Sequence, residues 1–181
     1  MKHSNIAIFI PHVGCPHFCS FCNQCNISGE KNIPTGEDVK RICSSAINEI
    51  TDKANTEIAF FGGSFTAIDR EYMIELLSAA NEFVGEEKFR GIRISTRPDY
   101  IDDEILSILK KYRVTAIELG AQSMSDKVLD ANERGHSAED VRKASSLIKK
   151  YGFELGLQMM AGLYQSTESD DYFTMCEIIA L

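Results

Sequence analysis

The feature that most constrains the fold is an alternation, repeated five times, of a short apolar run and a longer helical pattern. Apolar runs with little internal alternation are typical of strands that are covered on both faces, as in parallel sheets. We predict strands over residues 6–11, 57–62, 91–96, 116–121 and 154–160. Repeated strand, loop and helix units form a parallel sheet with right-handed crossovers, either an open doubly wound sheet or a curved barrel.

Helical patterns follow each predicted strand, over residues 35–50, 69–84, 102–112, 137–152 and 169–181. Thr35 and Asp69 stand where N-caps are expected, and Ser137 has an acidic residue three positions later, close to a capping box. In barrels and in open α/β sheets alike, active sites lie on the loops that follow the strands. We therefore expect the functional residues just after each strand.

The length of 181 residues is enough for one domain with a hydrophobic core, which we place over 1–181. The composition is ordinary, with 44% hydrophobic and 25% charged residues. The last helical pattern ends without a stop signal, and no strand follows to pair with the fifth. An unpaired edge of that kind is unfavourable. We expect a fragment of a longer protein, or a chain that a partner completes.

The net charge of −8 disfavours a broad phosphate-binding surface, although a local basic groove remains open. The N-terminal apolar run is typical of a strand and not of a signal peptide, and no apolar stretch approaches the roughly 20 residues of a membrane span. We therefore expect a cytoplasmic protein with no membrane partner. In a reducing compartment, six cysteines indicate metal binding or catalysis before disulfides.

The loop after the first strand contains Cys15, Cys19 and Cys22 in the spacing C-x3-C-x2-C, with Cys25 close behind. Thiolates this close together can bind an iron–sulfur cluster, while structural zinc usually takes two separated pairs and is the alternative. If all four cysteines bind, the site is closed, whereas three leave one position open for chemistry. The remaining two, Cys43 and Cys176, lie in helical patterns, and we expect both to be buried small hydrophobic residues.

The segment GCPHFCSFCNQC after a first strand resembles the cluster loop of radical S-adenosylmethionine (radical SAM) enzymes. The resemblance implies that Cys15, Cys19 and Cys22 bind three irons of a 4Fe-4S cluster, whose fourth iron binds the amino and carboxylate groups of S-adenosylmethionine (SAM). One electron from the cluster then cleaves SAM to methionine and a 5′-deoxyadenosyl radical, which abstracts hydrogen from a substrate. Phe21 matches an aromatic residue that is frequent there in the family; alternatively, it only packs over the cluster.

The ends of the second and third strands match further contacts to SAM in this family. Glycines allow a backbone to approach a ligand closely, and the resemblance implies that Gly62, Gly63 and the adjoining Ser64 bind the amino end of the cofactor. Ser95, with Thr96, can reach the ribose by hydrogen bonds, although a glutamate matches Ser95 in some relatives. The next two residues, Arg97 and Pro98, either shape the turn or take part in function.

The segment IELGAQSMSDKVLDANERGHS closely resembles oxygen-independent coproporphyrinogen oxidases and the radical domain of the Elongator catalytic subunit. The match implies that Gln122 faces the ligand and that Arg134, in a short following helix, binds the SAM carboxylate. In the fifth-strand segment LQMMAGLY, Gln158 stands where relatives often carry an aspartate or glutamine that faces the ribose. Glu118 either points into the barrel or pairs with a neighbour. We expect His136 to be a surface cap residue.

The resemblance implies a partial (βα)6 barrel of the radical SAM type, here with about five βα units, so that 1–181 is the N-terminal part of the core domain. It implies an enzyme that abstracts hydrogen from an unidentified substrate and receives electrons from a flavodoxin or ferredoxin type of donor. Likeness to the group of the Elongator catalytic subunit and methylthiotransferase-like proteins indicates tRNA modification, and a tetrapyrrole is a weaker option. The alternatives are a non-catalytic module whose four cysteines close an iron–sulfur or zinc site, and an inactive truncated product.

Overall fold

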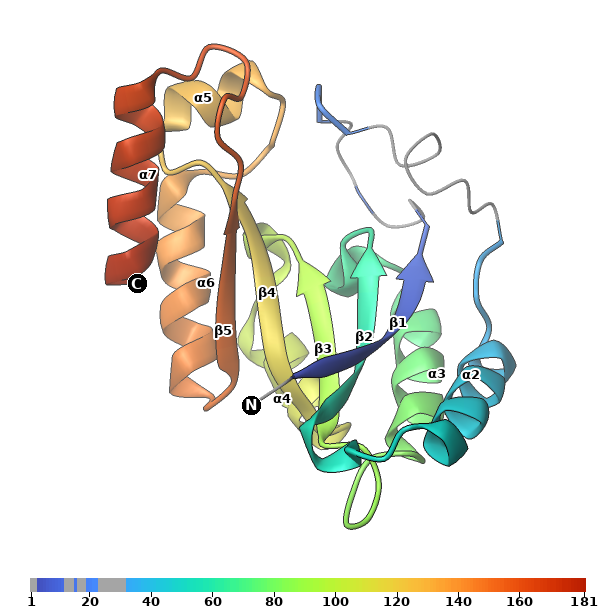
Figure 1. Ribbon diagram of the computed structural model, residues 1–181. Coiled ribbons are helices and arrows are strands. Elements are labelled where there is room, and N and C mark those ends of the chain that lie inside the picture. Colours follow the sequence, from blue (N-terminus) through green and yellow to red (C-terminus); the bar gives the residue numbers. More distant parts are fainter. Residues whose placement is uncertain (1–2, 12–14, 16–18, 23–31) are drawn as a thin grey trace.

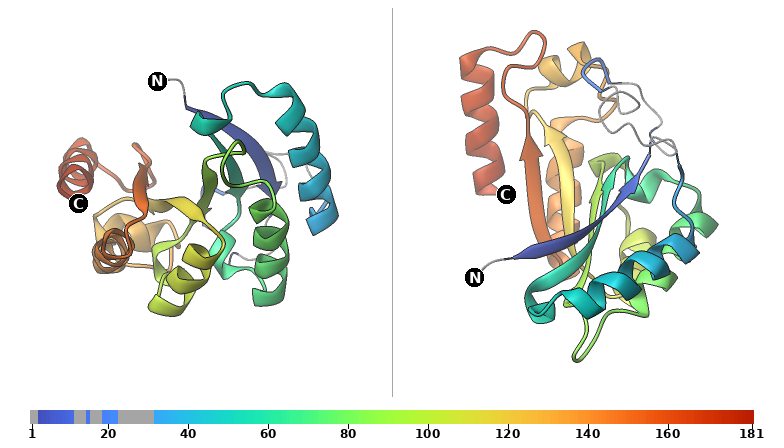
Figure 2. Two further views of the ribbon diagram at one scale, coloured as in Figure 1. Left: turned by 90° about the horizontal axis from the view of Figure 1, so that it is seen from below. Right: turned by 45° about the vertical axis from the view of Figure 1, so that its right-hand side comes forward.

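The computed structural model describes residues 3–11, 15, 19–22 and 32–181. Within them, five strands form one parallel sheet in the order β1-β2-β3-β4-β5. The sheet curves into an arc, and its helices lie on the convex side (Figures 1 and 2). The strands are β1 (Ser4–Ile10), β2 (Thr56–Gly62), β3 (Gly91–Thr96), β4 (Val114–Gln122) and β5 (Glu154–Met159). This architecture confirms the predicted partial barrel of about five βα units.

The helices begin close to the predicted caps. Thr35 and Ser137 both form complete capping boxes, and Asp69 accepts hydrogen bonds from two backbone N–H groups of the first turn of its helix. The helices are α2 (Gly36–Glu49), α3 (Arg70–Asn81), α4 (Asp103–Lys111), α5 (Asp126–Ala131), α6 (Ala138–Lys150) and α7 (Glu168–Ala180). The first strand ends at Ile10, one residue before the prediction, since Pro11 has no N–H to continue the ladder.

The main core lies between the convex face of the sheet and the helices. Ile58 and Phe60 on β2 and Ile94 on β3 are fully buried there, facing Leu76 of α3 and Leu106 of α4. The apolar runs of the sequence therefore reflect strands covered by helices on this side.

The prediction for the two helical cysteines is confirmed for one and wrong for the other. Cys43 on α2 is fully buried, and this burial raises the pKa of its thiol to about 12. Cys176 on α7 is exposed. Two residues turn a helix by about 200°, so Cys176 lies opposite Thr174, the residue that α7 buries.

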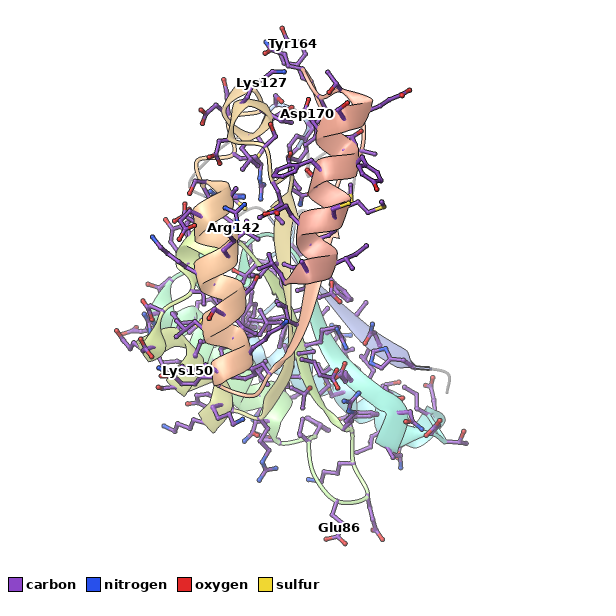
Figure 3. The ribbon with its side chains drawn as sticks, turned by 90° about the vertical axis from the view of Figure 1, so that its left-hand side faces the viewer. Glu86, Lys127, Arg142, Lys150, Tyr164 and Asp170 are labelled. Carbon is purple, nitrogen blue, oxygen red and sulfur yellow. The ribbon has the colours of Figure 1, made fainter. Side chains whose placement is uncertain are left out.

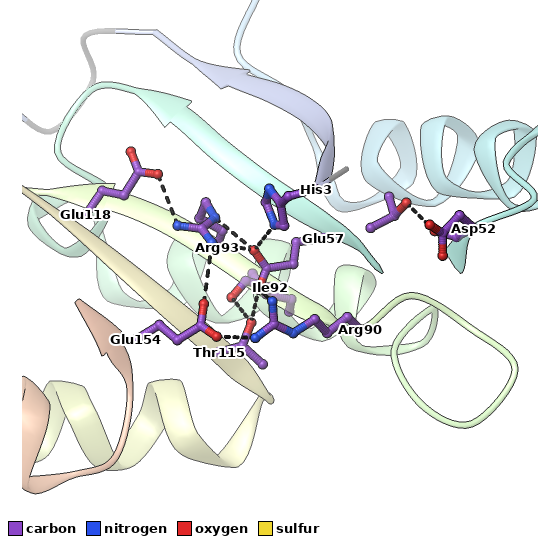
Figure 4. A network of polar contacts seen from close by, with 10 residues as sticks. His3, Asp52, Glu57, Arg90, Ile92, Arg93, Thr115, Glu118 and Glu154 are labelled. Carbon is purple, nitrogen blue, oxygen red and sulfur yellow. Dashed lines mark hydrogen bonds and ion pairs between the residues drawn. The ribbon is translucent and has the colours of Figure 1, made fainter. Parts of the chain in front are cut away.

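The concave face of the sheet is polar. Figure 4 shows Arg93 between Glu57 and Glu118, with Nε 2.8 Å from Glu57 Oε2 and Nη1 3.1 Å from Glu118 Oε1. Burial works to raise the pKa of Glu57, but hydrogen bonds from Thr115 and His3 and the charge of Arg93 outweigh it, so the pKa lies below its usual range. The concave face of the sheet thus presents paired charges, whereas the convex face packs against the helices in the hydrophobic core.

The last helix packs beside α6 (Figure 3). Arg142 of α6 forms an ion pair with Glu177, and Lys127 of α5 lies 3.9 Å from Asp170 near the start of α7. None of the helices in the described residues combines the length and the apolar character that crossing a membrane requires.

Candidate functional site

A cleft at the carboxyl ends of the strands collects residues from the ends of β2 to β5 and from the loops that follow β1 to β4. Every residue predicted to hold a cluster or SAM lines it, except that Cys25, left open by the sequence, lies outside the described residues. The described lining consists of Cys15, Cys19, Phe21, Cys22, Gly62, Gly63, Ser64, Ser95, Thr96, Arg97, Gly120, Gln122, Arg134 and Gln158. Residues that are up to 143 positions apart in the sequence are therefore neighbours here, as the topology requires.

The cysteine loop is anchored to the residue that follows α5. The Ser20 backbone N–H donates to the Asn132 carbonyl over 3.2 Å, and the Ser20 hydroxyl donates to Asn132 Oδ1 over 3.0 Å. Cys19 is buried, whereas Cys15 and Cys22 are partly exposed to the cleft. Burial raises the pKa of the Cys15 thiol, although the Ser64 backbone N–H and the charge of Arg97 act in the opposite direction.

The three described cysteines share the cleft without forming a single-ion site. No group of three or more histidine, cysteine, aspartate or glutamate side chains among the described residues could hold one metal ion. Ligands of one zinc ion converge on a point, whereas a cluster spreads its irons over several positions. The three described thiols line one cleft, and Cys25 lies outside the described residues.

The two glycines at the end of β2 lie close to β1, and the first of them is required there. Gly62 has a φ of +110°, and a Cβ atom there would lie 2.4 Å from the carbonyl oxygen of Ile10. The Gly63 backbone N–H donates to that same oxygen over 2.8 Å. The pair therefore makes a tight turn beside Cys15, which brings backbone rather than side chains to the cleft.

The Ser64 hydroxyl belongs to a buried network under the cleft. It lies 3.0 Å from the Thr96 hydroxyl and accepts the backbone N–H of Arg97 over 3.1 Å. Thr96 also bonds the hydroxyl of Thr66. These bonds tie the ends of β2 and β3 together, so Thr96 supports the floor of the cleft.

Arg134 is one of two buried arginines among the described residues that line the cleft. Its Nη1 lies 3.2 Å from Cys19 Sγ, its Nη2 donates to the Gly120 carbonyl over 2.7 Å, and its guanidinium carbon lies 5.8 Å from the centre of the Phe21 ring. Its Nε has no hydrogen-bond partner among the described residues. A buried guanidinium with an unused donor at a cleft fits a carboxylate ligand.

Arg134 lies outside the predicted helix, since α5 ends at Ala131 and Glu133 has a φ of 54°. The turn after the helix, and not the helix itself, directs the side chain. Arg97 supports this turn: it is buried, forms a bidentate pair with Asp99 over 2.9 and 3.0 Å, and donates to the Arg134 carbonyl. Arg97 therefore shapes the turn and holds Arg134 in place.

The end of β4 is strained at Gln122, which has a φ of 65° and marks a register irregularity against β5. Such conformations collect at ligand sites. Gly120 makes room for it, because a Cβ there would lie 2.9 Å from Gln122 Nε2 and 3.4 Å from Arg134 Nη2. The sequence reasoning missed Gly120, although a glycine inside an apolar strand is a recognised signal of close approach.

Beside Gly120, on the neighbouring strand β5, Gln158 donates from Nε2 to Glu118 Oε2 over 2.7 Å. Ser95 on β3 lies 3.5 Å from the same oxygen. Glu118 thus does both things that the sequence left open: it points into the concave side and pairs with its neighbours.

The prediction for His136 is wrong, because the side chain is buried and not at the surface. Its Nε2 lies 3.3 Å from the Ala121 carbonyl, while Nδ1 has no partner within the described residues. Burial, and then the charge of Arg134, lowers the pKa of His136 to about 4. The turn at Gly135, which has a φ of 72°, directs the residue toward the end of β4, where Ala121 lies.

This pKa makes stability depend on pH. A histidine with a lowered pKa binds its proton more weakly in the folded chain, so its neutral form supports the fold fully above pH 6.5. The support is lost as the pH falls from 6.5 toward 4, by about 3 kcal/mol at the lower end. Urea unfolding of the wild type and of His136→Gln should differ in pH slope over this range. Equal slopes would contradict the assignment.

The comparison with protein families shows the family of the chain, since residues 9–174 match the model of the radical SAM superfamily. The chain belongs to the radical SAM superfamily. The match covers the cysteine loop and all later strands that contribute to the cleft, so the fold and the family agree.

Within this superfamily, the chain is 29% identical to the tRNA uridine(34) acetyltransferase of Methanocaldococcus infernus, over 62% of this chain and 24% of that protein. The solved structure of Methanocaldococcus infernus Elp3 superposes with a TM-score of 0.69 at 22% identity, covering 99% of this chain and 43% of that one. Coproporphyrinogen III oxidase of Escherichia coli superposes with a TM-score of 0.66 at 16% identity, covering 99% and 42%. The chain spans less than half the length of each of these proteins.

Proposed function

We propose that this chain is the N-terminal part of a radical SAM core domain that binds a 4Fe-4S cluster and SAM. Cys15, Cys19 and Cys22 hold the cluster, and the position they leave open takes the amino and carboxylate groups of SAM. When both are bound, the cluster and SAM would supply the reductive cleavage of SAM and the abstraction of hydrogen from a substrate.

The observation that supports this proposal is the position of Arg134. Its guanidinium lies beside Cys19 with an unused buried donor, so a ligand held at the cysteines brings its carboxylate within reach. Across the cleft, the backbone of Gly62 and Gly63 faces the amino group. An electron-transfer module closed by four cysteines does not require these residues.

Product analysis tests the activity. The protein is reconstituted with iron and sulfide without oxygen, reduced with dithionite and incubated with SAM. We expect methionine and 5′-deoxyadenosine in equal amounts, and neither product from Cys19→Ser. Iron bound by the wild type with no cleavage of SAM would contradict the proposal.

We further propose a tRNA as the substrate and a flavodoxin or ferredoxin as the electron donor. The relatives named for tRNA uridine(34) acetylation support a tRNA as the substrate. A 4Fe-4S cluster needs electrons of low potential, which supports a flavodoxin or ferredoxin as the donor. Unmodified tRNA added to the cleavage assay should raise the rate of 5′-deoxyadenosine formation, while a porphyrinogen should not. The opposite pattern would favour a tetrapyrrole.

A further inference from the structure

A carboxylate on the concave face lies directly behind two residues of the cleft. Glu118 is not among the described residues that line the cleft, but its Oε2 accepts from Gln158 Nε2 over 2.7 Å and from Ser95 Oγ over 3.5 Å. Both of these partners line the cleft. Glu118 therefore supports, from behind, the wall that β3 and β5 present to a ligand.

The position of Glu118 is itself fixed. Strand register pairs Glu118 with Ser95 on one side and with Gly156 on the other. Arg93 Nη1 donates to Oε1 over 3.1 Å, as Figure 4 shows. A Cβ at Gly156 would lie 3.2 Å from Glu118 Cγ, so the glycine lets the side chain cross β5 toward Gln158. Donors from three residues thus meet one carboxylate.

The chemistry of a carboxylate sets the orientation of its partners. An ionised carboxylate only accepts hydrogen bonds, so Gln158 must turn its NH2 group toward Glu118 and its Oε1 away from it. The single hydroxyl hydrogen of Ser95 is likewise directed to Glu118, which leaves the oxygen to accept. This wall of the cleft therefore offers acceptors, which match hydroxyl donors on a ligand.

We propose that Glu118 is a positioning residue that orients Gln158 and Ser95 to accept hydrogen bonds from the ribose hydroxyls of SAM. The inference rests on the proposed function, which makes SAM the ligand. The amino acid end of SAM is held elsewhere, at Arg134 and the glycine turn. Removing the carboxylate of Glu118 should therefore weaken the binding of SAM, which has a ribose. It should not change the binding of free methionine, which has none.

The variant Glu118→Gln tests this separation. Arg93 donates to Oε1 of Glu118, whereas Gln158 donates to Oε2. An amide at position 118 keeps only one of these acceptor oxygens. Because a charge-assisted hydrogen bond is the stronger one, we expect that oxygen to face Arg93, so that Gln158 loses its partner or reverses its own amide. The probes are SAM and free methionine, each titrated into the anaerobically reconstituted full chain. We expect the dissociation constant for SAM to rise roughly tenfold and that for methionine to change less than about twofold. Equal weakening of both ligands would show a merely structural role and overturn the inference.

Glu154→Gln is the matched control. Glu154 is a carboxylate on the same face, and its recorded ion pairs are with Arg90 and, at 3.6 Å, with Arg93. Removing its charge should leave both affinities unchanged, because it contacts neither Ser95 nor Gln158 in the described structure. A loss of SAM affinity equal to that of Glu118→Gln would mean that the charge of the face, and not the orientation of Gln158, is what matters.

A second variant, at Gln158, tests whether Glu118 acts through Gln158, and it does so at a position where misfolding is not expected. Gln158 is exposed, so Gln158→Leu should fold and show the same SAM-selective loss by itself. Adding Glu118→Gln to the Gln158→Leu variant should weaken SAM binding by less than about threefold further. The effects of two residues that act through one another are not additive. A full additional tenfold loss would overturn the inference. If the wild type binds neither ligand, the proposed function falls with it, whereas SAM binding without the selective loss refutes only the role of Glu118.

Discussion

Replacing Gly62 by alanine is expected to destabilise the chain more than any other single methyl group added at a described glycine of the cleft. The new Cβ would lie 2.4 Å from the Ile10 carbonyl oxygen and 2.7 Å from the Phe9 ring, at a φ of +110° that L residues rarely adopt. Backbone strain and overpacking together should cost roughly 2 to 5 kcal/mol. The free energy of unfolding in urea, measured without cluster or cofactor, checks this value.

Gly162→Ala is the matched control for this prediction. Gly162 also has a positive φ, +72°, but nothing lies within 4 Å of a Cβ there. Its cost should be about 1 to 2 kcal/mol, which is that of the backbone conformation alone. Equal losses at the two glycines would mean that the approach of β1 to β2 does not require Gly62.

Replacing Arg134 by alanine is expected to weaken SAM binding roughly 100-fold, since the carboxylate of the ligand loses charge-assisted hydrogen bonds in a buried setting. Iron and sulfide content should be measured first, because Arg134 Nη1 also contacts Cys19. Binding is then compared at equal cluster content by titration with SAM.

The matched control is Arg113→Ala. Arg113 Nη1 donates to the Val84 carbonyl over 2.6 Å, and the residue precedes the start of β4, at the end of the sheet away from the cleft. The Arg113→Ala protein should bind SAM with the affinity of the wild type. An Arg134→Ala protein with normal cluster content and normal affinity would remove this arginine from the cofactor site.

The strands and caps could be predicted because their signals are local. The apolar runs, the capping residues Thr35 and Ser137 and the position of Gly62 at the end of β2 each follow from a few neighbouring residues. The gathering of the cleft residues could be predicted too, because parallel topology places every strand's carboxyl end at one edge.

The errors arose where distant parts of the chain decide the outcome. His136 is buried because the turn at Gly135 brings it against Ala121, and Cys176 is exposed because α7 buries its opposite face. The link from Glu118 to Gln158 depends on strand register and on the missing side chain of Gly156. In each case the deciding contact is with another element of the fold, which the neighbouring residues in the sequence do not specify.

The most direct test of the central claim is the electron paramagnetic resonance spectrum of the reduced, reconstituted protein with and without SAM, recorded for the wild type and for Cys25→Ser. The account predicts that SAM changes the spectrum and that both proteins respond alike, since three cysteines hold the cluster and one iron is open. A spectrum that ignores SAM in the wild type and responds only after Cys25 is replaced would contradict it, because all four cysteines would then close the site.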